Sequence, residues 1–332
     1  AMDLLAKRRP RWGVLLFTVG CAFGALAVHL YVGELVSMTA QPLGGSRLAS
    51  FMTMGTVLLR YLVLLVSPLG LSVTHDVVPL QQWTPLALFG WLLFLGLGVS
   101  AVFFLMLKKS GRFLSVWIWC FAPLLPVSQF LVPLQNVMTD RYLFLSAMAP
   151  ALVLGFIAER QGSLAKFAVA SVLLVWAGFS SLRGWMFSDS ELLFNDALAQ
   201  TQYSPIPPYQ LGMLADGRGD KRNTEKFFRM AINRNQLALA QDLLPHTAAR
   251  RASNNLARLL VSEGRLGEAV QVLELARQDW PSDSKLAGNL LQVLMRQERR
   301  DEAEVLCLLR MKNGFPQSTK IERLCLTLSQ SP

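Results

Sequence analysis

The sequence predicts an all-α protein, in which a polytopic bundle of transmembrane helices is followed by a superhelix of repeated helix pairs. Residues 12 to about 183 form long apolar runs with very few charges, whereas residues from about 185 onward have the mixed composition of a water-soluble domain. In this second half, apolar and small residues recur with the period of a helical-repeat protein. We therefore divide the chain into a transmembrane domain over 1–184 and a repeat domain over 185–332.

The composition limits the classes of function. Of the 332 residues, 52% are hydrophobic and only 16% are charged, and the formal net charge is +10. We assign the positive excess to Lys and Arg residues that flank the apolar runs, as the positive-inside rule predicts. No basic stripe with interleaved aromatic residues is present, so we expect no nucleic-acid partner. No spacing of Cys and His residues predicts a metal site.

Five apolar runs have the length of about 17 to 25 residues that a helix needs to cross the hydrocarbon core. They cover residues 12–31, 84–107, 113–132, 142–158 and 164–182. The first is too long for the apolar region of a signal peptide. It contains a pair of glycines, Gly20 and Gly24, and one histidine, His29, all of which we assign to helix packing. Pro123, Pro126 and Pro150 are expected to kink their helices.

The segment 51–73 is apolar enough to span, but Arg60 lies near its middle. If it lies in the interface or re-enters, then residues 7–11, 108–112 and the turn at Arg160 and Lys166 all face the cytoplasm, in agreement with the positive-inside rule. Arg60 also avoids the bilayer centre, which would cost at least about 2.5 kcal/mol. We favour this arrangement over a sixth span. It places 32–83, 133–141 and everything after Trp185 on the external side.

The repeat becomes visible when two units are aligned. The positions Leu256, Ala269, Leu273 and Pro281 correspond to Leu290, Ala303, Cys307 and the Phe315-Pro316 pair. An earlier unit with Leu211, Phe228 and Ala231 is offset by more than one period, which implies an insertion of about 11 residues near 235–248. The 34-residue period matches the tetratricopeptide repeat, whose stacked helix pairs form a concave surface for a peptide or a partner protein. The alternative is a scaffold that only packs on the membrane domain.

A few ionisable residues lie in or next to the apolar runs, where a charge is costly and therefore tends to have a function. Arg141 and Arg60 are candidates for binding a phosphate through the guanidinium fork. Asp140 and Arg141 have an alternative reading as a local ion pair that caps the next helix. The favoured reading of His75 and Asp76 is a solvated turn.

The four cysteines fall into two groups. Cys21 and Cys120 lie in apolar runs and are read as small buried or lipid-facing residues. Cys307 and Cys325 both lie in the repeat domain and would pair in an oxidising compartment. Two buried thiols are the favoured reading of this second group.

Four stretches together resemble a known family. They are residues 135–145 around Asp140-Arg141-Tyr142, 60–72 beginning with Arg60-Tyr61-Leu62, 3–12 beginning with Asp3-Leu4-Leu5, and 185–197 beginning with Trp185. In this order they resemble the transmembrane and tetratricopeptide-repeat O-mannosyltransferases, over nearly the whole chain. The resemblance implies a donor sugar, mannose, on a polyprenyl phosphate at the external membrane face, and repeats that bind the protein acceptor.

The same resemblance implies roles for the polar residues. The reaction would be an inverting transfer to a Ser or Thr hydroxyl, with a carboxylate as base. Arg141 and Arg60 would contact the donor phosphate, and Asp140, Tyr142, His75 and Asp76 would support them. The family's base lies in the first external loop, whereas the loop 32–50 offers only Glu34 and does not resemble that motif. We therefore assign no catalytic residue.

The missing acidic motif also affects how much of such an enzyme we expect this chain to contain. We expect it to be the C-terminal part of a longer enzyme, with the N-terminal membrane half as a partner beside the lipid bilayer. A non-enzymatic membrane adaptor whose repeats recruit other proteins is the alternative function. A transporter is disfavoured, because no inverted repeat is evident. The absence of an Asn-x-Ser/Thr sequon favours a bacterial inner membrane, with the repeats in the periplasm.

Overall fold

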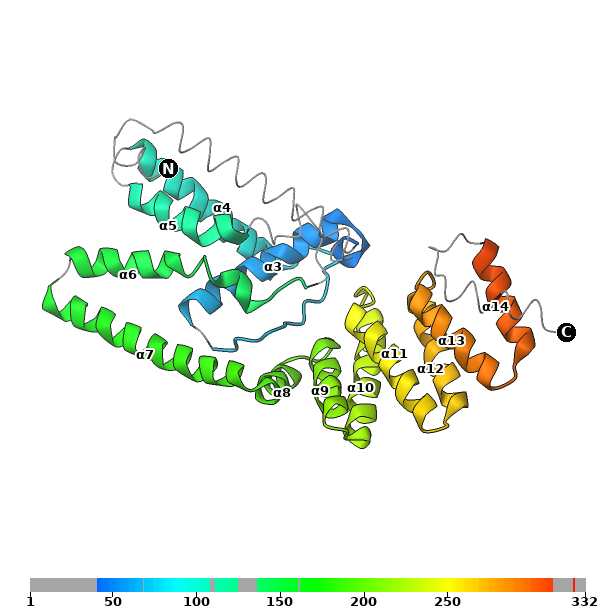
Figure 1. Ribbon diagram of the computed structural model, residues 1–332. Coiled ribbons are helices and arrows are strands. Elements are labelled where there is room, and N and C mark those ends of the chain that lie inside the picture. Colours follow the sequence, from blue (N-terminus) through cyan, green and yellow to red (C-terminus); the bar gives the residue numbers. More distant parts are fainter. Residues whose placement is uncertain are drawn as a thin grey trace, which may run out of the picture. The chain divides into compact units, whose positions relative to one another are not determined.

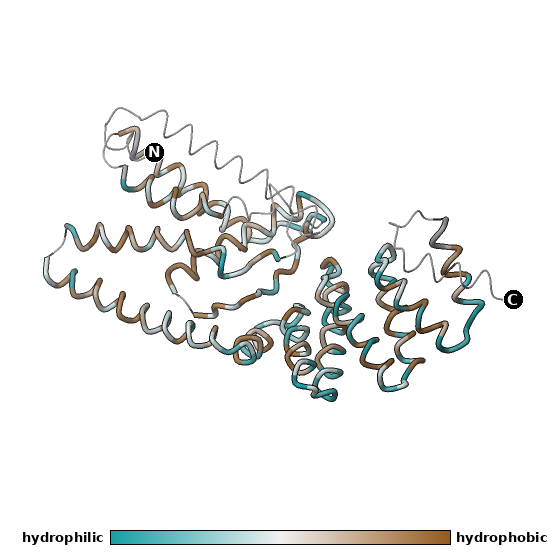
Figure 2. The backbone as a smooth tube through the Cα atoms, in the orientation of Figure 1, coloured by the Kyte–Doolittle hydropathy of each residue, from teal (hydrophilic) through white to brown (hydrophobic). Residues whose placement is uncertain are grey.

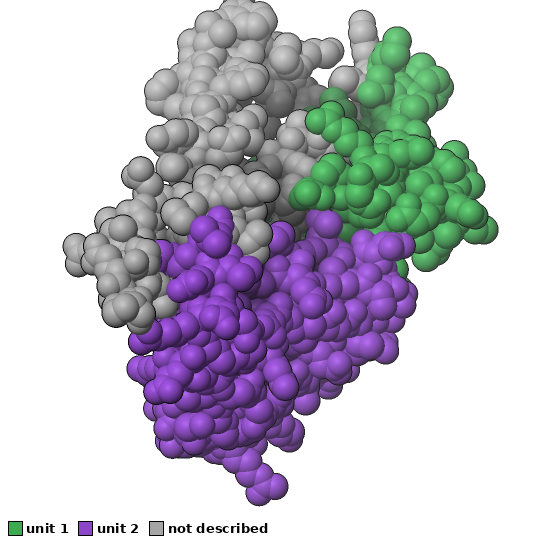
Figure 3. Space-filling view, turned by 90° about the vertical axis from the view of Figure 1, so that its right-hand side faces the viewer, with its two compact units in different colours: residues 1–188 green, residues 189–332 purple. Residues whose placement is uncertain are grey.

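The computed structural model describes residues 41–67, 69–107, 111–124, 136–160, 162–312 and 325. These residues form helices and connecting segments and no strand, as predicted (Figure 1). The chain divides into two compact units, Ala1–Ser188 (unit 1) and Asp189–Pro332 (unit 2), so the division falls slightly after the predicted boundary (Figure 3). The predicted span 12–31, with its glycine pair, Cys21 and His29, lies outside the described residues.

Unit 1 contains five α-helices and three short 3₁₀ turns among its described residues. These are η1 Leu43–Gly45, α3 Arg47–Val66, α4 Pro85–Met106, α5 Gly111–Phe121, η2 Ala122–Leu124, η3 Asp140–Leu143, α6 Met148–Arg160 and α7 Ser163–Ser188. Three of them, α3, α4 and α7, are long and apolar enough to cross a membrane. In Figure 2, brown hydrophobic residues recur along α4 and α7, where they alternate with paler residues. Many of these side chains are exposed, including Leu92, Val99 and Leu174.

The helix bounds differ from the predicted spans in informative places. The run 84–107 becomes α4 almost without change, and α7 continues to Ser188, beyond the predicted end at Leu182. α5 ends at Phe121, and Pro123 lies in the 3₁₀ turn that follows it. α6 begins only at Met148, so Pro150 lies in its first turn, where a backbone N–H has no helical acceptor. The kink that we predicted at Pro150 is therefore wrong, and Pro126 lies outside the described residues.

The segment around Arg60 forms one unbroken helix. Ser46 caps α3 by accepting a hydrogen bond from the Ala49 N–H at 3.0 Å, and the helix then continues for 20 residues to Val66. Its length of about 30 Å matches a hydrocarbon core. Residues 51–66 are therefore not a hairpin of two half-helices. The interfacial or re-entrant position of the segment in the bilayer stays a prediction.

Two glycines let α3 and α4 pack at very short range. A Cβ atom on Gly90 would lie 2.0 Å from the carbonyl oxygen of Gly55, so this crossing requires glycine at position 90. Beside it, the rings of Phe51 and Trp91 stack with their centroids 4.4 Å apart, and the Trp91 indole N–H donates to the Phe51 carbonyl at 3.0 Å. This crossing holds α3, and with it Arg60, in place.

Unit 2 is a stack of helices in which each packs on the next along the chain (Figure 1). They are α8 Ser190–Gln200, α9 Ile206–Gly217, α10 Lys221–Leu239, α11 Thr247–Ser262, α12 Leu266–Asp279, α13 Ser284–Arg296 and α14 Arg300–Lys312. The predicted period relates equivalent core positions. Leu256 and Leu290 are both buried, and so are Ala269 and Ala303.

The turns between paired helices repeat as well. Gly219, Gly264 and Glu298 occupy equivalent turns, one in each helix pair, and have left-handed φ values of 74°, 75° and 60°. Glycine adopts this conformation at little cost. The insertion predicted near 235–248 is confirmed. Relative to the next unit, α10 continues five residues further, its linker is three residues longer, and α11 begins three residues earlier.

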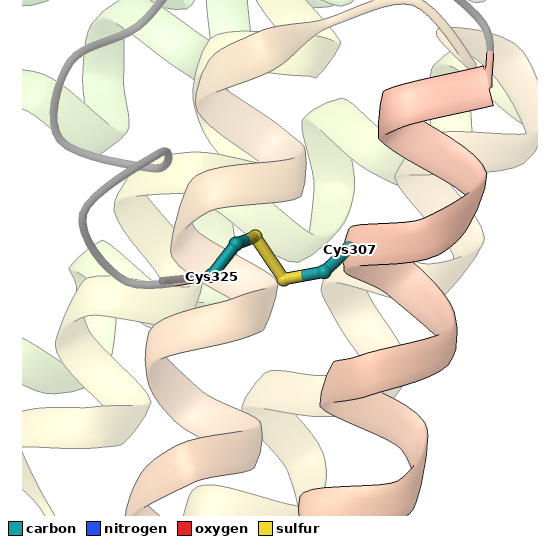
Figure 4. The surroundings of a disulfide bond; sticks show 2 residues. All are labelled: Cys307 and Cys325. Carbon is teal, nitrogen blue, oxygen red and sulfur yellow. A yellow bond between two sulfur atoms is a disulfide. The ribbon is translucent and has the colours of Figure 1, made fainter. Parts of the chain in front are cut away.

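A disulfide bond joins Cys307 on α14 to Cys325 (Figure 4). Our favoured reading of these two residues as buried thiols is therefore wrong. Their spacing in the sequence could not show that the chain returns to α14, because that return depends on the path of the chain in between. Cys120 in unit 1 is a buried free cysteine, which agrees with the sequence reading.

Candidate functional site

Three segments of unit 1 bring the predicted polar residues together. They are α3, the irregular stretch 71–84 that follows it, and η3 with the residues just before it. Arg60 on α3 donates a hydrogen bond through Nη1 to the carbonyl oxygen of Asp76 at 3.1 Å. His75 Nε2 lies 2.7 Å from Asp140 Oδ1, although the two residues are far apart in the chain. We call these residues, together with Arg141 and Tyr142, the polar cluster.

The stretch 71–84 is held along α3 by hydrogen bonds at two levels. Gly70, with a left-handed φ of 78°, lies in the turn that reverses the chain after α3. The Leu80 N–H donates to Thr53 Oγ1 at 2.9 Å, and the Thr53 hydroxyl donates in turn to the Ala49 carbonyl at 2.7 Å. Because Asp76 lies at the level of Arg60 and Leu80 at the level of Thr53, this stretch runs antiparallel to α3.

Sequence reasoning did not identify Tyr61 as a site residue. Its side chain is 2% exposed, and its hydroxyl accepts a hydrogen bond from the Thr139 N–H at 3.3 Å. Tyr61 therefore ties α3 to the residue that precedes Asp140. Its position next to Arg60, within an otherwise aliphatic run, was the available signal, since a buried tyrosine hydroxyl usually needs a polar partner.

The His75–Asp140 pair corrects two readings of the sequence. The His75 side chain is only 16% exposed, so His75 is not part of a solvated turn. Asp140, 19% exposed, contacts this histidine instead of forming a local ion pair with Arg141. A carboxylate that contacts one imidazole nitrogen sets the orientation of the ring. The pair thus positions its neighbours Asp76 and Arg141 relative to each other.

Arg141 is an exposed cation of this cluster. Its guanidinium lies 5.6 Å from the centre of the Tyr142 ring, and no carboxylate within the described residues pairs with it. Tyr142 is fixed more weakly, since its hydroxyl is 3.5 Å from the Asn136 carbonyl. Arg60 is also exposed and uses one donor on Asp76. The cluster therefore offers guanidinium N–H groups that suit a phosphate or a carboxylate.

An apolar cavity of about 710 Å³ lies within the same unit. It is lined by residues of α3 to α7, and its lining contains almost no polar surface. Leu62 and Val66 contribute from α3, and Ala149 and Pro150 contribute from the start of α6. Arg60 thus lies on α3, which lines the cavity. Asp140 and Arg141 precede α6, whose first residues also line it. A cavity of this lining suits a hydrocarbon chain.

The opposite end of α6 has different chemistry. There Glu159 forms an ion pair with Arg112 at 3.0 Å, so the start of α5 and the end of α6 lie together. Asp140 and Arg141 precede the other end of α6. A helix of 13 residues is about 20 Å long. Arg112, one of the predicted cytoplasmic cations, and the polar cluster therefore lie at opposite ends of this helix.

No group of three or more metal-ligating side chains occurs in the part of the chain that the structure describes. Neither a known protein-family model nor a curated protein sequence matches the chain. A proposal of function therefore depends on the polar cluster, the apolar cavity and the helix stack.

Proposed function

We propose that unit 1 binds a polyprenyl-phosphate sugar and that unit 2, as a tetratricopeptide-repeat domain, binds a protein acceptor. The chain would then be the C-terminal part of a membrane glycosyltransferase, with mannose as the sugar that the resemblance implies. The observation that carries the proposal is the exposed guanidinium of Arg141 beside the His75–Asp140 pair, in the unit whose helix α3 carries Arg60 and also lines an apolar cavity. One ligand with an anionic head and a hydrocarbon tail satisfies both features.

The head and the tail of such a donor place different demands on the site. Charge-assisted hydrogen bonds from Arg141 and Arg60 would hold the phosphate. The isoprenoid chain would fill the cavity, where burial of apolar surface is favourable at about 25 cal/mol per Å². Tyr142 beneath the Arg141 guanidinium and Asp76 beside Arg60 would limit the motion of the two cations.

The transfer step needs a base that we do not assign. In an inverting transfer a carboxylate accepts the proton of the acceptor hydroxyl while that oxygen displaces the phosphate. The Asp140 carboxylate is engaged by His75, and Asp76 holds Arg60 through its backbone carbonyl, so we give both residues a supporting role. We propose that the N-terminal membrane half supplies the base. Reaction at the external face of a bacterial inner membrane would place unit 2 in the periplasm.

Donor binding by the full chain in lipid nanodiscs tests the proposal. We expect Arg141→Ala to weaken binding of a polyprenyl-phosphate mannose by about tenfold or more, because it removes charge-assisted hydrogen bonds of about 1.5–3 kcal/mol each. Arg141→Lys should lose less, since it keeps the charge but not the fork. Arg112→Ala, at the other end of α6, is the control. Equal affinity of the Arg141→Ala and Arg112→Ala chains would remove Arg141 from this role.

The topology can be tested separately. A reporter that is active only outside the cytosol, fused after Pro332, should be active. Activity of a matching cytosolic reporter alone would contradict the transferase, because donor and acceptor would then lie on different sides. Partner capture by unit 2 without any donor binding by unit 1 would instead favour the membrane adaptor.

A further inference from the structure

The turn between α9 and α10 carries more positive charge than the equivalent turns of unit 2. Residues 218–223 contain three cations and one carboxylate. The equivalent residues 263–268 contain one cation and two carboxylates, and residues 297–302 contain two cations and three carboxylates. In chain order, the net charges of the three turns are therefore +2, −1 and −1. We use the name basic turn for the three cations of the first turn and the next cation of α10, which are Arg218, Lys221, Arg222 and Lys226.

All four cations of the basic turn are exposed. Arg218 pairs with Glu191 of α8, its Nη1 lying 2.6 Å from Glu191 Oε2. Lys221, Arg222 and Lys226 take part in none of the ion pairs within the described residues. Three ammonium and guanidinium groups thus point into solvent from one short segment.

The two carboxylates of the same segment are already engaged. Asp220 caps α10 by accepting the backbone N–H of Asn223 at 3.0 Å and its amide N–H at 2.6 Å. Hydrogen bonds from Asn223, and to a smaller extent the charge of Arg222, lower the pKa of Asp220. Glu225 accepts from Arg265 at 2.7 Å, and the hydrogen bonds from Arg265 lower its pKa to about 2. Neither carboxylate forms an ion pair with the exposed cations, so the positive charge of the turn remains available.

Contacts within unit 2 place the basic turn at the edge where α8 begins. The Arg218–Glu191 ion pair joins the turn to the first turn of α8. Further along, Arg234 of α10 donates to the carbonyl oxygen of Leu198, near the end of α8, at 3.0 Å. Helices α8 and α10 therefore start at the same edge of unit 2 and run in the same direction.

The start of α8 is also the point at which the chain leaves a candidate span. One residue, Asp189, separates α8 from α7, which is long and apolar enough to cross a membrane. The last turn of α7 carries the exposed rings of Trp185 and Phe187, and aromatic residues are typical of the bilayer interface. The four residue steps from Phe187 to Glu191 span at most about 14 Å. A basic turn held at Glu191 therefore lies close to the headgroups when α7 crosses the bilayer.

We propose that the basic turn binds the anionic headgroups of the phospholipids around α7, and so holds the first helix pair of unit 2 at the membrane surface. Its guanidinium and ammonium groups would donate charge-assisted hydrogen bonds to lipid phosphates. Arg218 would contribute less than the other three cations, because Glu191 partly neutralises it. The inference goes beyond the proposed function. It depends on α7 as a span and on neither the sugar donor nor the protein acceptor.

The position of the turn favours a lipid surface over a soluble polyanion. Headgroups surround the end of a span permanently, and the short connection between α7 and α8 keeps their effective concentration at the turn high. A soluble nucleic acid or acidic protein has no such advantage. The negative net charge of the next two turns would be repelled by the same surface. Anionic lipid would therefore attract the first helix pair and repel the later ones.

Resonance energy transfer to headgroup-labelled lipid can measure how close the turn lies to the bilayer. The test uses the full chain in nanodiscs, with a dye on Gly217→Cys, where an added side chain has no other atom within 4 Å. Cys21 and Cys120 are replaced by Ala, so that the new thiol alone reacts. We expect more transfer in equal parts of phosphatidylglycerol and phosphatidylcholine than in phosphatidylcholine alone. This excess should disappear in about 1 M salt, where the Debye length is about 3 Å.

Two double variants with the same change of charge sharpen the test. Lys221→Glu with Arg222→Glu should abolish the excess, so that the two lipids give equal transfer. Carboxylates suit the first turn of a helix, so this change should not unfold α10. Arg251→Glu with Lys285→Glu reverses two exposed cations on α11 and α13 and should keep the excess. Circular dichroism of each variant verifies its fold.

Four outcomes would overturn the inference. They are equal transfer in the two lipids for the unaltered chain, an excess that survives high salt, equal losses in the two double variants, and loss of the excess when polyglutamate or a single-stranded oligonucleotide is added at a concentration below that of the lipid. The last outcome would assign the basic turn to a soluble partner. Arg141→Ala should leave the transfer unchanged, so a failure of donor binding and a failure of this inference are distinguishable.

Discussion

Helix α7 of unit 1 and helix α11 of unit 2 place their apolar side chains in opposite environments. α7 has 26 residues and no buried residue among them, and Leu174 is 74% exposed. In α11, Leu256 and Leu260 are fully buried, while charged and amide side chains cover the outer face. The difference indicates that unit 2 has a hydrophobic core of its own and a polar surface that suits contact with water. Unit 1 presents the apolar exterior that we expect of helices surrounded by lipid or by further membrane helices.

The largest expected effect compares two phenylalanines. Phe228 is fully buried, and its ring fills the space above Gly212, where a Cβ atom would lie 2.6 Å from it. Phe228→Ala should destabilise unit 2 by about 3–5 kcal/mol, because it removes the ring and leaves a cavity. Phe167→Ala on α7, where the ring is 72% exposed, should change hydrogen exchange in unit 1 little. Amide hydrogen exchange on the full chain measures both, and equal effects would contradict the comparison.

A charge placed on each unit sharpens the same point. Leu174→Asp on α7 should oppose membrane insertion by about 2.5–3.5 kcal/mol, since a carboxylate at the centre of a span loses its hydration. Leu275→Asp on α12, where the side chain is 40% exposed, should be tolerated. Resistance of the chain to alkaline extraction from membranes is the measurement. Retention of the Leu174→Asp chain at the level of Leu275→Asp would argue against α7 as a span.

A disulfide bond cross-links unit 2, whereas the described cysteine of unit 1, Cys120, is free. Cys307→Ser with Cys325→Ser should lower the stability of α14 by about 2–3 kcal/mol, because the cross-link no longer restricts the unfolded chain. Faster hydrogen exchange confined to α13 and α14 is the expected result. Cys325→Ser alone should also release Cys307 for alkylation. Alkylation of Cys307 in the unaltered chain, isolated without reductant, would show that the bond does not form.

Acid should weaken unit 2 through His246. Burial, and then the nearby Arg251, lower the pKa of His246 to about 4, and its Nδ1 caps α11 by accepting the Ala248 N–H at 3.0 Å. Because the unfolded chain binds this proton near pH 6.5 and the folded chain only near pH 4, stability is complete above about 6.5. About 3 kcal/mol is lost as the pH falls to about 4.

His246→Asn isolates this effect, because asparagine caps a helix but does not titrate in this range. Hydrogen exchange of α11 should respond to pH between about 6.5 and 5 in the unaltered chain and stay flat in the variant. Glu225, whose pKa is lowered to about 2, loses its contribution only below its ordinary value and leaves this window unaffected. An identical pH response of the two chains would exclude His246 as the cause.

The features that could be predicted from sequence are those with a period or a run length. The run 84–107 predicted α4, because a helix in an apolar environment needs a continuous apolar stretch. The repeat period predicted the burial of Leu256 and Leu290 and the insertion after Asn235, since stacking units repeat their core positions. The start of α6 at Met148 was missed, because residues 142–147 are as apolar as the helix that follows them.

The polar cluster could be predicted only in part. The sequence pointed to five of its residues, because ionisable side chains near an apolar run are costly and tend to be functional. They are Arg60, His75, Asp76, Asp140 and Arg141. The sequence did not predict the partners of these residues. One reading of the sequence paired Asp140 with Arg141, whereas the structure pairs Asp140 with His75. Tyr61, whose hydroxyl accepts a hydrogen bond from the Thr139 N–H, was not identified from the sequence.

By itself, the order of residues determined the helical class, the division near Ser188 and the spacing of the helix pairs, because these follow from hydrophobic runs and periods along one chain. Only the tertiary structure decided which polar groups meet, that Cys307 bonds to Cys325, and that α3 approaches α4 through Gly55 and Gly90. Contacts between distant residues depend on how helices pack. A single pair of such residues leaves no periodic trace in the sequence.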